Sequence, residues 1–287
     1  MGKRFLDDND DIEELDDELE EDTESEDEEL EEQEERPQRP HRQKDPSVEI
    51  LFEDEHLVVI VKPAGLDSTR GQYSVRCVLD VLEERLKNLP GPLRLVHRLD
   101  RDTSGLMVLA KTPEAQKNLS TQWETRSVEK RYLALVHGMV QPREGVIDLP
   151  LRKTENQSRP VVPDRAKGKD AVTEYHVVEQ YRQYALVEAH PVTGRMHQIR
   201  VHFAAEGTPV LGDGHYGTAE PLLLSKFKRG YKPSERKGEE KPLIARLALH
   251  AHTLKFDHPA TNARMEFKRD LPKDFAAAIK QLSKYGR

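Results

Sequence analysis

Two carboxylates stand inside a short polar loop between two apolar segments of the sequence. Asp100 and Asp102 belong to the run His97–Gly105, where they lie next to arginines and precede a Thr-Ser-Gly. Side chains of Asp, Thr and Ser often cap the amides of such a turn, so a structural role is one interpretation. The other is that an aspartate held beside arginines serves as a nucleophile or a base.

A second cluster is rich in arginine and histidine. We expect a helix over residues 194–206 that begins at a glycine turn and has one apolar face and one polar edge. The polar edge consists of Arg195, His197, Gln198, Arg200 and His202. A solvated helix face is the default interpretation. The same edge also fits phosphate binding or carboxylate pairing, because arginine makes bidentate, charge-assisted bonds to both groups.

A tyrosine marks the third cluster. Tyr132 follows two basic residues in a strand expected over residues 130–136. A half-buried strand tyrosine usually packs against its neighbours, whereas in a nucleic-acid site it stacks on a base. The sequence therefore leaves packing and base stacking as alternatives for this residue.

A metal centre is the competing chemistry, because the chain has 12 histidines. His197 and His202 are five residues apart and would not share a helix face. His250 and His252 would share a strand face but lack a third ligand nearby in the sequence. We therefore expect no metal site.

The pattern of apolar residues along the chain predicts the strands and helices that carry these clusters. Runs rich in β-branched residues indicate paired strands over residues 48–52 and 57–61. Short apolar runs indicate buried strands over residues 93–96 and 106–110, and further strand candidates, several of them alternating, lie over residues 130–136, 172–178, 184–189 and 247–256. Helical spacing indicates helices over residues 75–86, 113–126, 194–206 and 273–285. Strands in series without a regular βαβ rhythm favour an α+β domain built on a largely antiparallel sheet.

Charge is distributed unevenly along the 287 residues. Residues 7–35 hold 21 acidic side chains and no Lys or Arg, with few apolar residues to offset the entropy of ordering. We expect residues 1–45 to form a disordered acidic tail and a Pro/Arg linker ahead of a single domain over residues 46–287. The tail either aids solubility or mimics a polyanion that competes for the basic face behind it.

The domain itself is basic, although the whole chain has a net charge of -8. Residues 45–287 hold 39 of the 45 basic residues and 32 of the 53 acidic ones, which gives a net charge of +7. A basic surface insertion is expected over residues 219–242, where lysines and arginines stand among Gly, Pro and Ser. This balance fits an anionic partner.

The sequence argues against a disulfide-stabilised secreted scaffold, a zinc finger and a membrane-spanning protein. The single cysteine, Cys77, cannot form an internal disulfide or a thiolate cage for a metal. No apolar run approaches the roughly 18–20 residues of a membrane span, and the N-terminus is acidic where a signal peptide would be basic. We expect a soluble, cytoplasmic protein that does not contact membranes.

Taken in order, the clusters resemble the RluA-type family of RNA pseudouridine synthases. The family's signature HxLDxxTSG stands at His97–Gly105. Its companion elements stand at Lys62–Gly65 (KPxG), Lys130–Tyr132 (K-x-Tyr), Gly194–His202 (GRxHQIRxH) and Leu249–Ala251 (Leu-His-Ala). The resemblance covers roughly residues 48–275. It implies a pseudouridine synthase-like α+β catalytic domain, with a largely antiparallel or mixed sheet, flanking helices and a central basic cleft.

The resemblance also implies an activity, the isomerisation of uridine to pseudouridine in RNA without a cofactor. By the family pattern, Asp100 is the catalytic aspartate and Arg200 its partner. Tyr132 matches the tyrosine that lies against the uracil. A phenol with an ordinary pKa near 10 would be a poor base, so stacking is the firmer part of that assignment.

RNA contacts follow from the same pattern. The target base must be flipped out of its stem-loop, and Arg98 would enter the vacated space. The residues expected to bind RNA are Arg98, Lys62, His97, Arg195, His197 and Gln198, together with the basic insertion. We expect a monomer that acts on a structured stem-loop of ribosomal or transfer RNA, as the compact members of the family do without a separate N-terminal RNA-binding domain.

Two rival functions remain open at this point. One is a catalytically silent RNA-binding protein or chaperone that uses the same cleft. The other is a hydrolase with Asp100 and Asp102 as paired carboxylates. Nothing in the sequence sets these two at the roughly 5–9.5 Å separation that glycoside hydrolysis needs.

Overall fold

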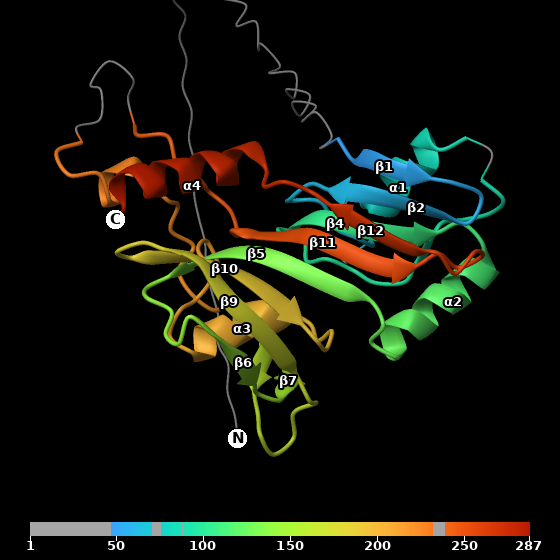
Figure 1. The fold of residues 1–287 in the computed structure, drawn as a ribbon, viewed down its shortest axis with the longest axis horizontal. Helices are drawn as coiled ribbons and strands as arrows, with labels where there is room; N and C mark the ends of the chain where they lie inside the picture. The colour runs from blue at the N-terminus through green and yellow to red at the C-terminus, as the bar shows by residue number, and fades with distance from the viewer. Residues whose placement is uncertain (1–46, 71–75, 88, 232–238) are drawn as a thin grey trace, which may run out of the picture. The chain divides into compact units, whose positions relative to one another are not determined.

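The computed structural model describes residues 47–70, 76–87, 89–231 and 239–287 (Figure 1). The expected acidic tail and linker lie outside the described residues, as does part of the basic insertion. The expectation of a tail therefore stays a prediction, and so does the boundary at residue 46.

A ten-stranded sheet forms the centre of the fold, with the order β1-β2-β4-β11-β5-β10-β9-β6; β3 pairs with β4, and β12 with β11. Its strands are β1 (Glu49–Glu53), β2 (Leu57–Lys62), β3 (Arg94–Leu95), β4 (Ser104–Ala110), β5 (Glu129–His137), β6 (Glu144–Asp148), β9 (Val172–Gln180), β10 (Tyr184–Pro191), β11 (Leu249–Asp257) and β12 (Arg264–Lys268). Among the described strands, β4 and β11 pair in parallel and all other neighbours pair antiparallel. The largely antiparallel, mixed sheet of the sequence analysis is thus confirmed.

The parallel pairing of β4 with β11 depends on a glycine. Gly105 lies opposite Ala251 with a φ of +121°. A Cβ at Gly105 would come within 2.3 Å of the carbonyl oxygen of Ala251, so no side chain fits there. This close approach joins the two parts of the sheet directly behind the loop that carries Asp100.

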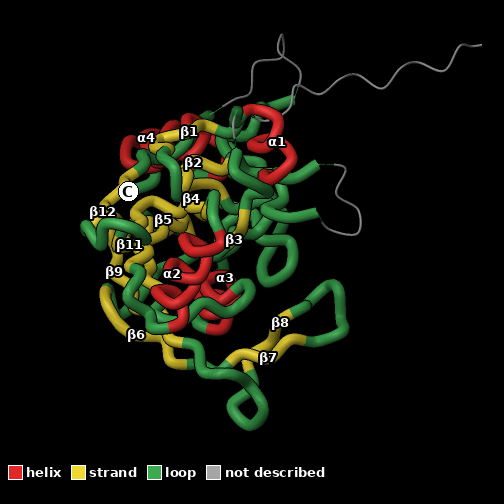
Figure 2. Tube along the Cα trace, turned by 90° about the vertical axis from the view of Figure 1, so that its right-hand side faces the viewer, coloured by secondary structure: helices red, strands yellow, loops and turns green. Residues whose placement is uncertain are grey.

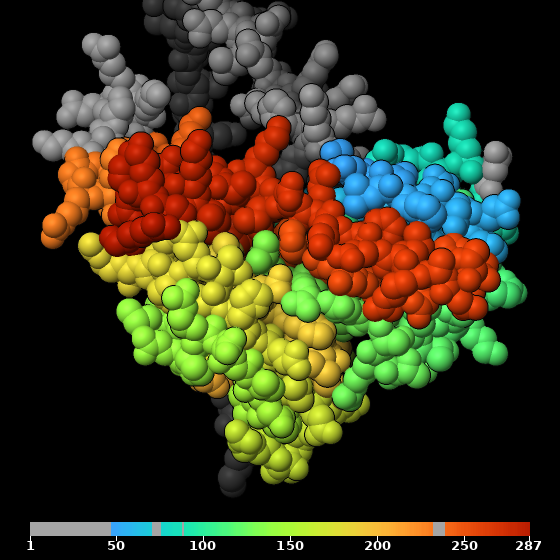
Figure 3. Space-filling model, in the orientation of Figure 1, coloured from blue at the N-terminus to red at the C-terminus, as the bar shows by residue number. Residues whose placement is uncertain are grey.

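In the described part of the chain four α-helices pack against the sheet. They are α1 (Val78–Arg85), α2 (Pro113–Glu124), α3 (Gln198–Ala205) and α4 (Lys273–Tyr285). Three of them bury an apolar stripe, whereas α3 buries six consecutive residues, three of them polar. The start of α2 follows from its sequence: Thr112 accepts a hydrogen bond from the amide of Ala115, and Pro113 occupies the first turn. In the space-filling view, the red C-terminal part of the chain lies between the blue part with β1 and β2 and the yellow part with β9 and β10 (Figure 3).

Several short elements were not predicted, among them the strands β6 and β12 of the main sheet. A separate hairpin of β7 (Leu151–Lys153) and β8 (Val161–Pro163) projects from the body of the protein (Figure 2). Within the insertion, a short 3-10 helix spans Leu224–Lys226. These segments are three to five residues long, which is too short to show the apolar periodicity by which the longer elements are predicted.

The helix expected over residues 194–206 begins only at Gln198. His197 directly before it has a φ of 54°, in the left-handed region, and ends the preceding turn. Arg195 and His197 therefore stand on a loop and not on the helix. The described helices include none that is both long and apolar enough to cross a membrane.

Candidate active site

The loop with Asp100 is held from both sides by buried polar contacts. The hydroxyl of Ser68 donates to the carbonyl of Leu99 at 2.8 Å and accepts from the Leu99 amide at 3.1 Å. The ammonium of Lys62 donates to the carbonyl of Arg101 at 2.8 Å. Because the residues on both sides of Asp100 are tied to the chain segment 62–68, the position of the carboxylate is fixed by the fold.

Lys62 was expected to contact phosphate, and the structure places it differently. Its side chain is buried, and its ammonium donates to the carbonyls of Pro63, Leu66 and Arg101 at 2.6–2.9 Å. Burial lowers the pKa of Lys62 to about 7, with Asp102 and Asp100 acting in the opposite direction. Three carbonyl acceptors nevertheless require three N–H donors, which only the charged ammonium has. Lys62 therefore positions the loop that carries Asp100.

Asp100 faces one guanidinium, as the family pattern implies. Arg200 Nη1 donates to Asp100 Oδ2 at 3.1 Å, from the first turn of α3. The Arg200 side chain is 8% exposed and that of Asp100 is 21% exposed, so the carboxylate keeps an open side. An exposed carboxylate oxygen next to a fixed cation is suited to act on a bound ligand.

Asp213 completes this ion pair, and the sequence analysis gave it no role. Nε and Nη2 of Arg200 donate to the two carboxylate oxygens of Asp213, both at 2.8 Å. Burial opposes the charged form of Arg200, but the carboxylates of Asp213 and Asp100 raise its pKa above the ordinary value. Burial also opposes ionisation of Asp213, and the bonds from Arg200 lower its pKa nonetheless.

His197 stands beside Asp100 without forming an ion pair at neutral pH. Its Nε2 lies 3.8 Å from Asp100 Oδ2, and its Nδ1 is 2.8 Å from the hydroxyl of Tyr216. Burial lowers the pKa of His197 to about 4, which outweighs the opposing effect of Asp100. The imidazole is therefore neutral at pH 7 and serves as a polar wall of the site.

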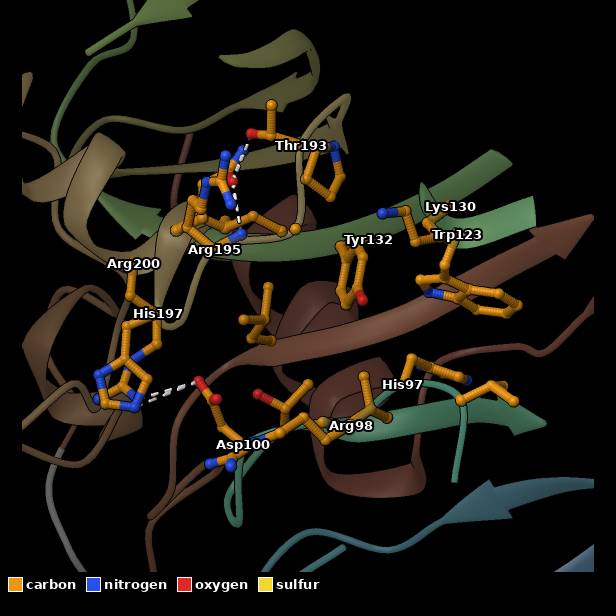
Figure 4. Close-up of a pocket in the computed structure, with 18 residues that line it drawn as sticks. His97, Arg98, Asp100, Trp123, Lys130, Tyr132, Thr193, Arg195, His197 and Arg200 are labelled. Atoms are coloured by element: carbon orange, nitrogen blue, oxygen red, sulfur yellow. Dashed lines mark hydrogen bonds and ion pairs between the residues drawn. The ribbon is translucent and has the colours of Figure 1, made fainter. Parts of the chain in front are cut away.

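Tyr132 forms the middle of a pocket of ≈ 270 Å³ whose lining includes Asp100 and Arg200 (Figure 4). Burial raises the pKa of Tyr132 well above its usual value, and the charge of Asp100 acts in the same direction. The phenol thus stays protonated at neutral pH, and its ring is available as a flat wall. This favours stacking on the uracil over action as a general base, the two roles that the family resemblance offered for this tyrosine.

Two further residues expected to bind RNA are engaged inside the protein. Gln198 is buried, donates to Val172 and Thr173, and accepts from the Thr193 hydroxyl and the Arg195 amide. His97 accepts a hydrogen bond from the amide of Val108 at 3.1 Å. Both residues line the pocket, but the hydrogen bonds above engage them within the protein. They therefore support the wall of the pocket.

Arg98 and Arg195 are exposed and do face solvent, as expected. Both line the catalytic pocket and also a neighbouring hollow of ≈ 570 Å³, where they are joined by Arg152, Lys153, Lys167 and Lys169. Asp100 and His197 border the two hollows as well. The carboxylate thus stands at the edge of a cleft lined with cations, which is the basic cleft expected from the sequence.

Sequence reasoning missed Asp213, Trp123 and Lys130. Asp213 belongs to a flanking segment that matched the family, but only the structure shows its bonds to Arg200. Trp123 is the one tryptophan of the chain, and it lines the pocket together with Lys130. Across the described ranges, no cluster of three or more His, Cys, Asp or Glu could hold a metal ion.

Comparison with known proteins identifies the class. The fold resembles the human protein RNA Pseudouridylate Synthase Domain Containing 4, with a TM-score of 0.62, 32% identity and coverage of 82% of this chain and 93% of that one. The model of the RNA pseudouridylate synthase family matches residues 56–205. The site and fold are therefore those of an enzyme that isomerises uridine in RNA.

Curated relatives extend over most of the chain. An uncharacterized RNA pseudouridine synthase of Bacillus subtilis, YlyB, is 36% identical over 84% of this chain and 74% of its own length. Ribosomal large subunit pseudouridine synthase D of Pseudomonas aeruginosa is 38% identical, over 81% and 71% respectively. The dual-specificity RNA pseudouridine synthase RluA of Salmonella typhi is 38% identical over 81% of this chain and 96% of that protein. The chain belongs to the RluA-type family of RNA pseudouridine synthases and is an isomerase of RNA uridine.

Proposed function

We propose that this enzyme converts specific uridines of structured stem-loops in ribosomal RNA, transfer RNA or both, and that Asp100 is its catalytic residue. The observation that carries the assignment is the bond from Arg200 Nη1 to Asp100 Oδ2 at 3.1 Å, inside a pocket that Asp100, Tyr132 and Arg200 line together. The relatives named for ribosomal RNA or for dual specificity supply the substrate class.

The reaction breaks the bond between N1 of uracil and C1′ of ribose, turns the base, and joins C5 to C1′. The C5 proton leaves to water and N1 ends protonated, so atoms and electrons balance without a redox partner. Asp100 acts on the ribose or the base, Arg200 holds its carboxylate in place, and the ring of Tyr132 keeps the loose uracil within the pocket.

Arg98 stands where it can support a flipped base. It is exposed, two residues before Asp100, and lines both the pocket and the basic hollow beside it. We assign it to the space that the flipped uridine leaves in the stem. Arg195 and the cations of the hollow contact phosphates, which gives affinity that depends on salt but not on sequence.

The remaining assignments concern the chain as a whole. We propose that residues 46–287 form the catalytic domain, that residues 1–45 form a tail outside it, and that the enzyme works as a monomer in the cytoplasm. A catalytically silent RNA-binding protein finds no support, because the matched relatives are named as synthases.

The test is tritium release from transcripts of ribosomal RNA and transfer RNA that carry 5-tritiated uridine. Release from one or both, followed by mapping of the product in a stem-loop, is the expected result. Release from neither would reject this substrate class. Free uracil in place of pseudouridine would indicate a hydrolase.

A further inference from the structure

The catalytic pocket is longer than a single uracil site requires. Asp100, Arg200 and His197 stand at one end, Tyr132 in the middle, and Trp123, Lys130 and His97 at the other end (Figure 4). The reaction described above uses the first end and the middle. The end with Trp123, here called the distal end, has no part in it.

Trp123 is held rigidly at the distal end. It stands in the last turn of α2, and its indole stacks on the ring of His97, with centroids 4.6 Å apart and an angle of 20°. His97 is itself fixed by the amide of Val108. Burial lowers the pKa of His97 to about 3, so its ring is neutral under ordinary conditions. His97 thus covers one face of the indole, and the surface that lines the pocket is the part on which a base can stack.

Lys130 adds a cation at the same end. It lies two residues before Tyr132 on β5, so both side chains project from one face of the sheet. Its Nζ lies 3.9 Å from the position that a Cβ would take at Gly194, across the pocket. Among the residues that the structure describes, no acidic group or hydrogen-bond acceptor engages this ammonium.

A flat aromatic surface beside an unpaired ammonium matches the two parts of a nucleotide, the base and the phosphate. We propose that the distal end binds the nucleotide next to the target uridine, with its base on Trp123 and its phosphate on Lys130. Both flanking nucleotides are covalently attached to the flipped residue, so each must pass close to the pocket whenever the uridine enters. The subsite would make conversion depend on the neighbouring base.

This proposal rests on the proposed function and is tested separately from it. Trp123 is the single tryptophan, so its fluorescence reports on the distal end of the unmodified protein. The probes are the transcripts of ribosomal and transfer RNA described above, intact or with an abasic nucleotide on either side of the mapped uridine. We expect saturable quenching with the intact transcript and much less quenching when one flanking base is absent.

Two outcomes overturn the subsite. One is tritium release without a saturable change in fluorescence from either transcript, which would leave the proposed function intact. The other is quenching that persists undiminished when either flanking base is removed. Absence of tritium release from both transcripts would instead count against the proposed function, on which the subsite rests.

Variants of Trp123 measure how much its indole contributes to RNA binding. Trp123→Leu should raise KM by roughly 5- to 150-fold with kcat changed little, which corresponds to the known range for stacking one base. Trp123→Phe keeps a ring and should restore most of the affinity. An unchanged KM in Trp123→Leu, with a normal melting temperature, would contradict the proposal.

Lys130→Met should lower the slope of log K against log salt by roughly 0.7–1, the contribution of one phosphate contact. Lys117→Met is the matched control, because Lys117 is exposed on α2 and lies outside the pocket lining. It should leave the slope unchanged. Equal slopes in wild type and Lys130→Met would show that Lys130 does not hold a phosphate.

Discussion

Arg200 is bound more fully by Asp213 than by Asp100. Asp213 takes the Nε and Nη2 donors, both at 2.8 Å, and its side chain has no exposed surface. One nitrogen, Nη1, is left to meet the catalytic carboxylate at 3.1 Å. The bidentate pair therefore sets the plane of the guanidinium and, through it, the position of Asp100.

Asp213→Asn should lower kcat at least tenfold and change KM little, because Arg200 loses its orientation while the RNA surface stays intact. Asp213→Ala should also lower the free energy of unfolding by roughly 3–5 kcal/mol, since it leaves a buried charge without its partner. Tritium-release kinetics and urea unfolding measure the two effects.

A second bidentate pair, Arg246–Asp274, serves as the control. It lies outside the catalytic pocket and is more exposed, with side-chain exposures of 20% and 38%. Asp274→Asn should therefore weaken folding slightly and leave kcat unchanged. Equal losses of kcat in both variants would mean that Asp213 acts through general stability alone.

Tyr132 should contribute through its ring. Tyr132→Phe is expected to retain RNA affinity, because burial keeps the native hydroxyl protonated and the flat wall remains. Tyr132→Ala should weaken binding by about 1–3 kcal/mol, the range for loss of one stacking platform. Filter binding with the stem-loop substrate checks both variants, and equal weakening by Phe and Ala would argue against a stacking role.

Lys62→Met tests the assignment of Lys62 as a positioning residue. The variant leaves three carbonyl acceptors without their donor, at roughly 1–3 kcal/mol for each group that stays buried and unsatisfied. We expect a lower melting temperature and an unchanged salt dependence of RNA binding. A smaller salt slope with normal stability would restore the phosphate contact expected from the sequence.

Buried histidines should make the protein sensitive to acid. Burial lowers the pKa of His250 to about 4, although the Arg269 carbonyl acts in the opposite direction. Between pH 6.5 and 4 the unfolded chain binds a proton at this residue and the native protein does not, so stability falls as pH falls.

His250→Asn should remove up to roughly 1.4 kcal/mol per pH unit from that slope. Urea unfolding between pH 4 and 6.5 measures it. The control is His176→Asn, at an exposed position of β9, which should leave the slope as in wild type. A slope that is identical in wild type and His250→Asn would contradict the prediction.

Local sequence pattern predicted the long elements and part of the site. Runs of β-branched residues marked β1 and β2, apolar or alternating runs marked β5 and β10, and the resemblance to the family implied that Asp100 and Arg200 meet. Elements such as β7 and β8 are three residues long and lack such a signal, because their stability comes from pairing with each other and from packing below them.

The roles of Lys62 and Gln198 could not be predicted for a different reason. A lysine or glutamine in a motif looks the same in sequence whether it faces RNA or a buried carbonyl. The partners that decide the matter, such as the carbonyl of Arg101 and the hydroxyl of Thr173, come from distant parts of the chain. Only the folded arrangement shows that these side chains are occupied.

The most direct measurement of the central claim is tritium release from 5-tritiated uridine in the stem-loop substrate, with wild type beside Asp100→Asn. Arg200 keeps its bidentate bond to Asp213 in the variant, so the fold should be preserved, which a melting curve verifies. We expect release by wild type and a loss of at least a thousandfold in Asp100→Asn, about 4 kcal/mol of transition-state stabilisation. Release at the wild-type rate by folded Asp100→Asn would contradict the assignment of Asp100 as the catalytic residue.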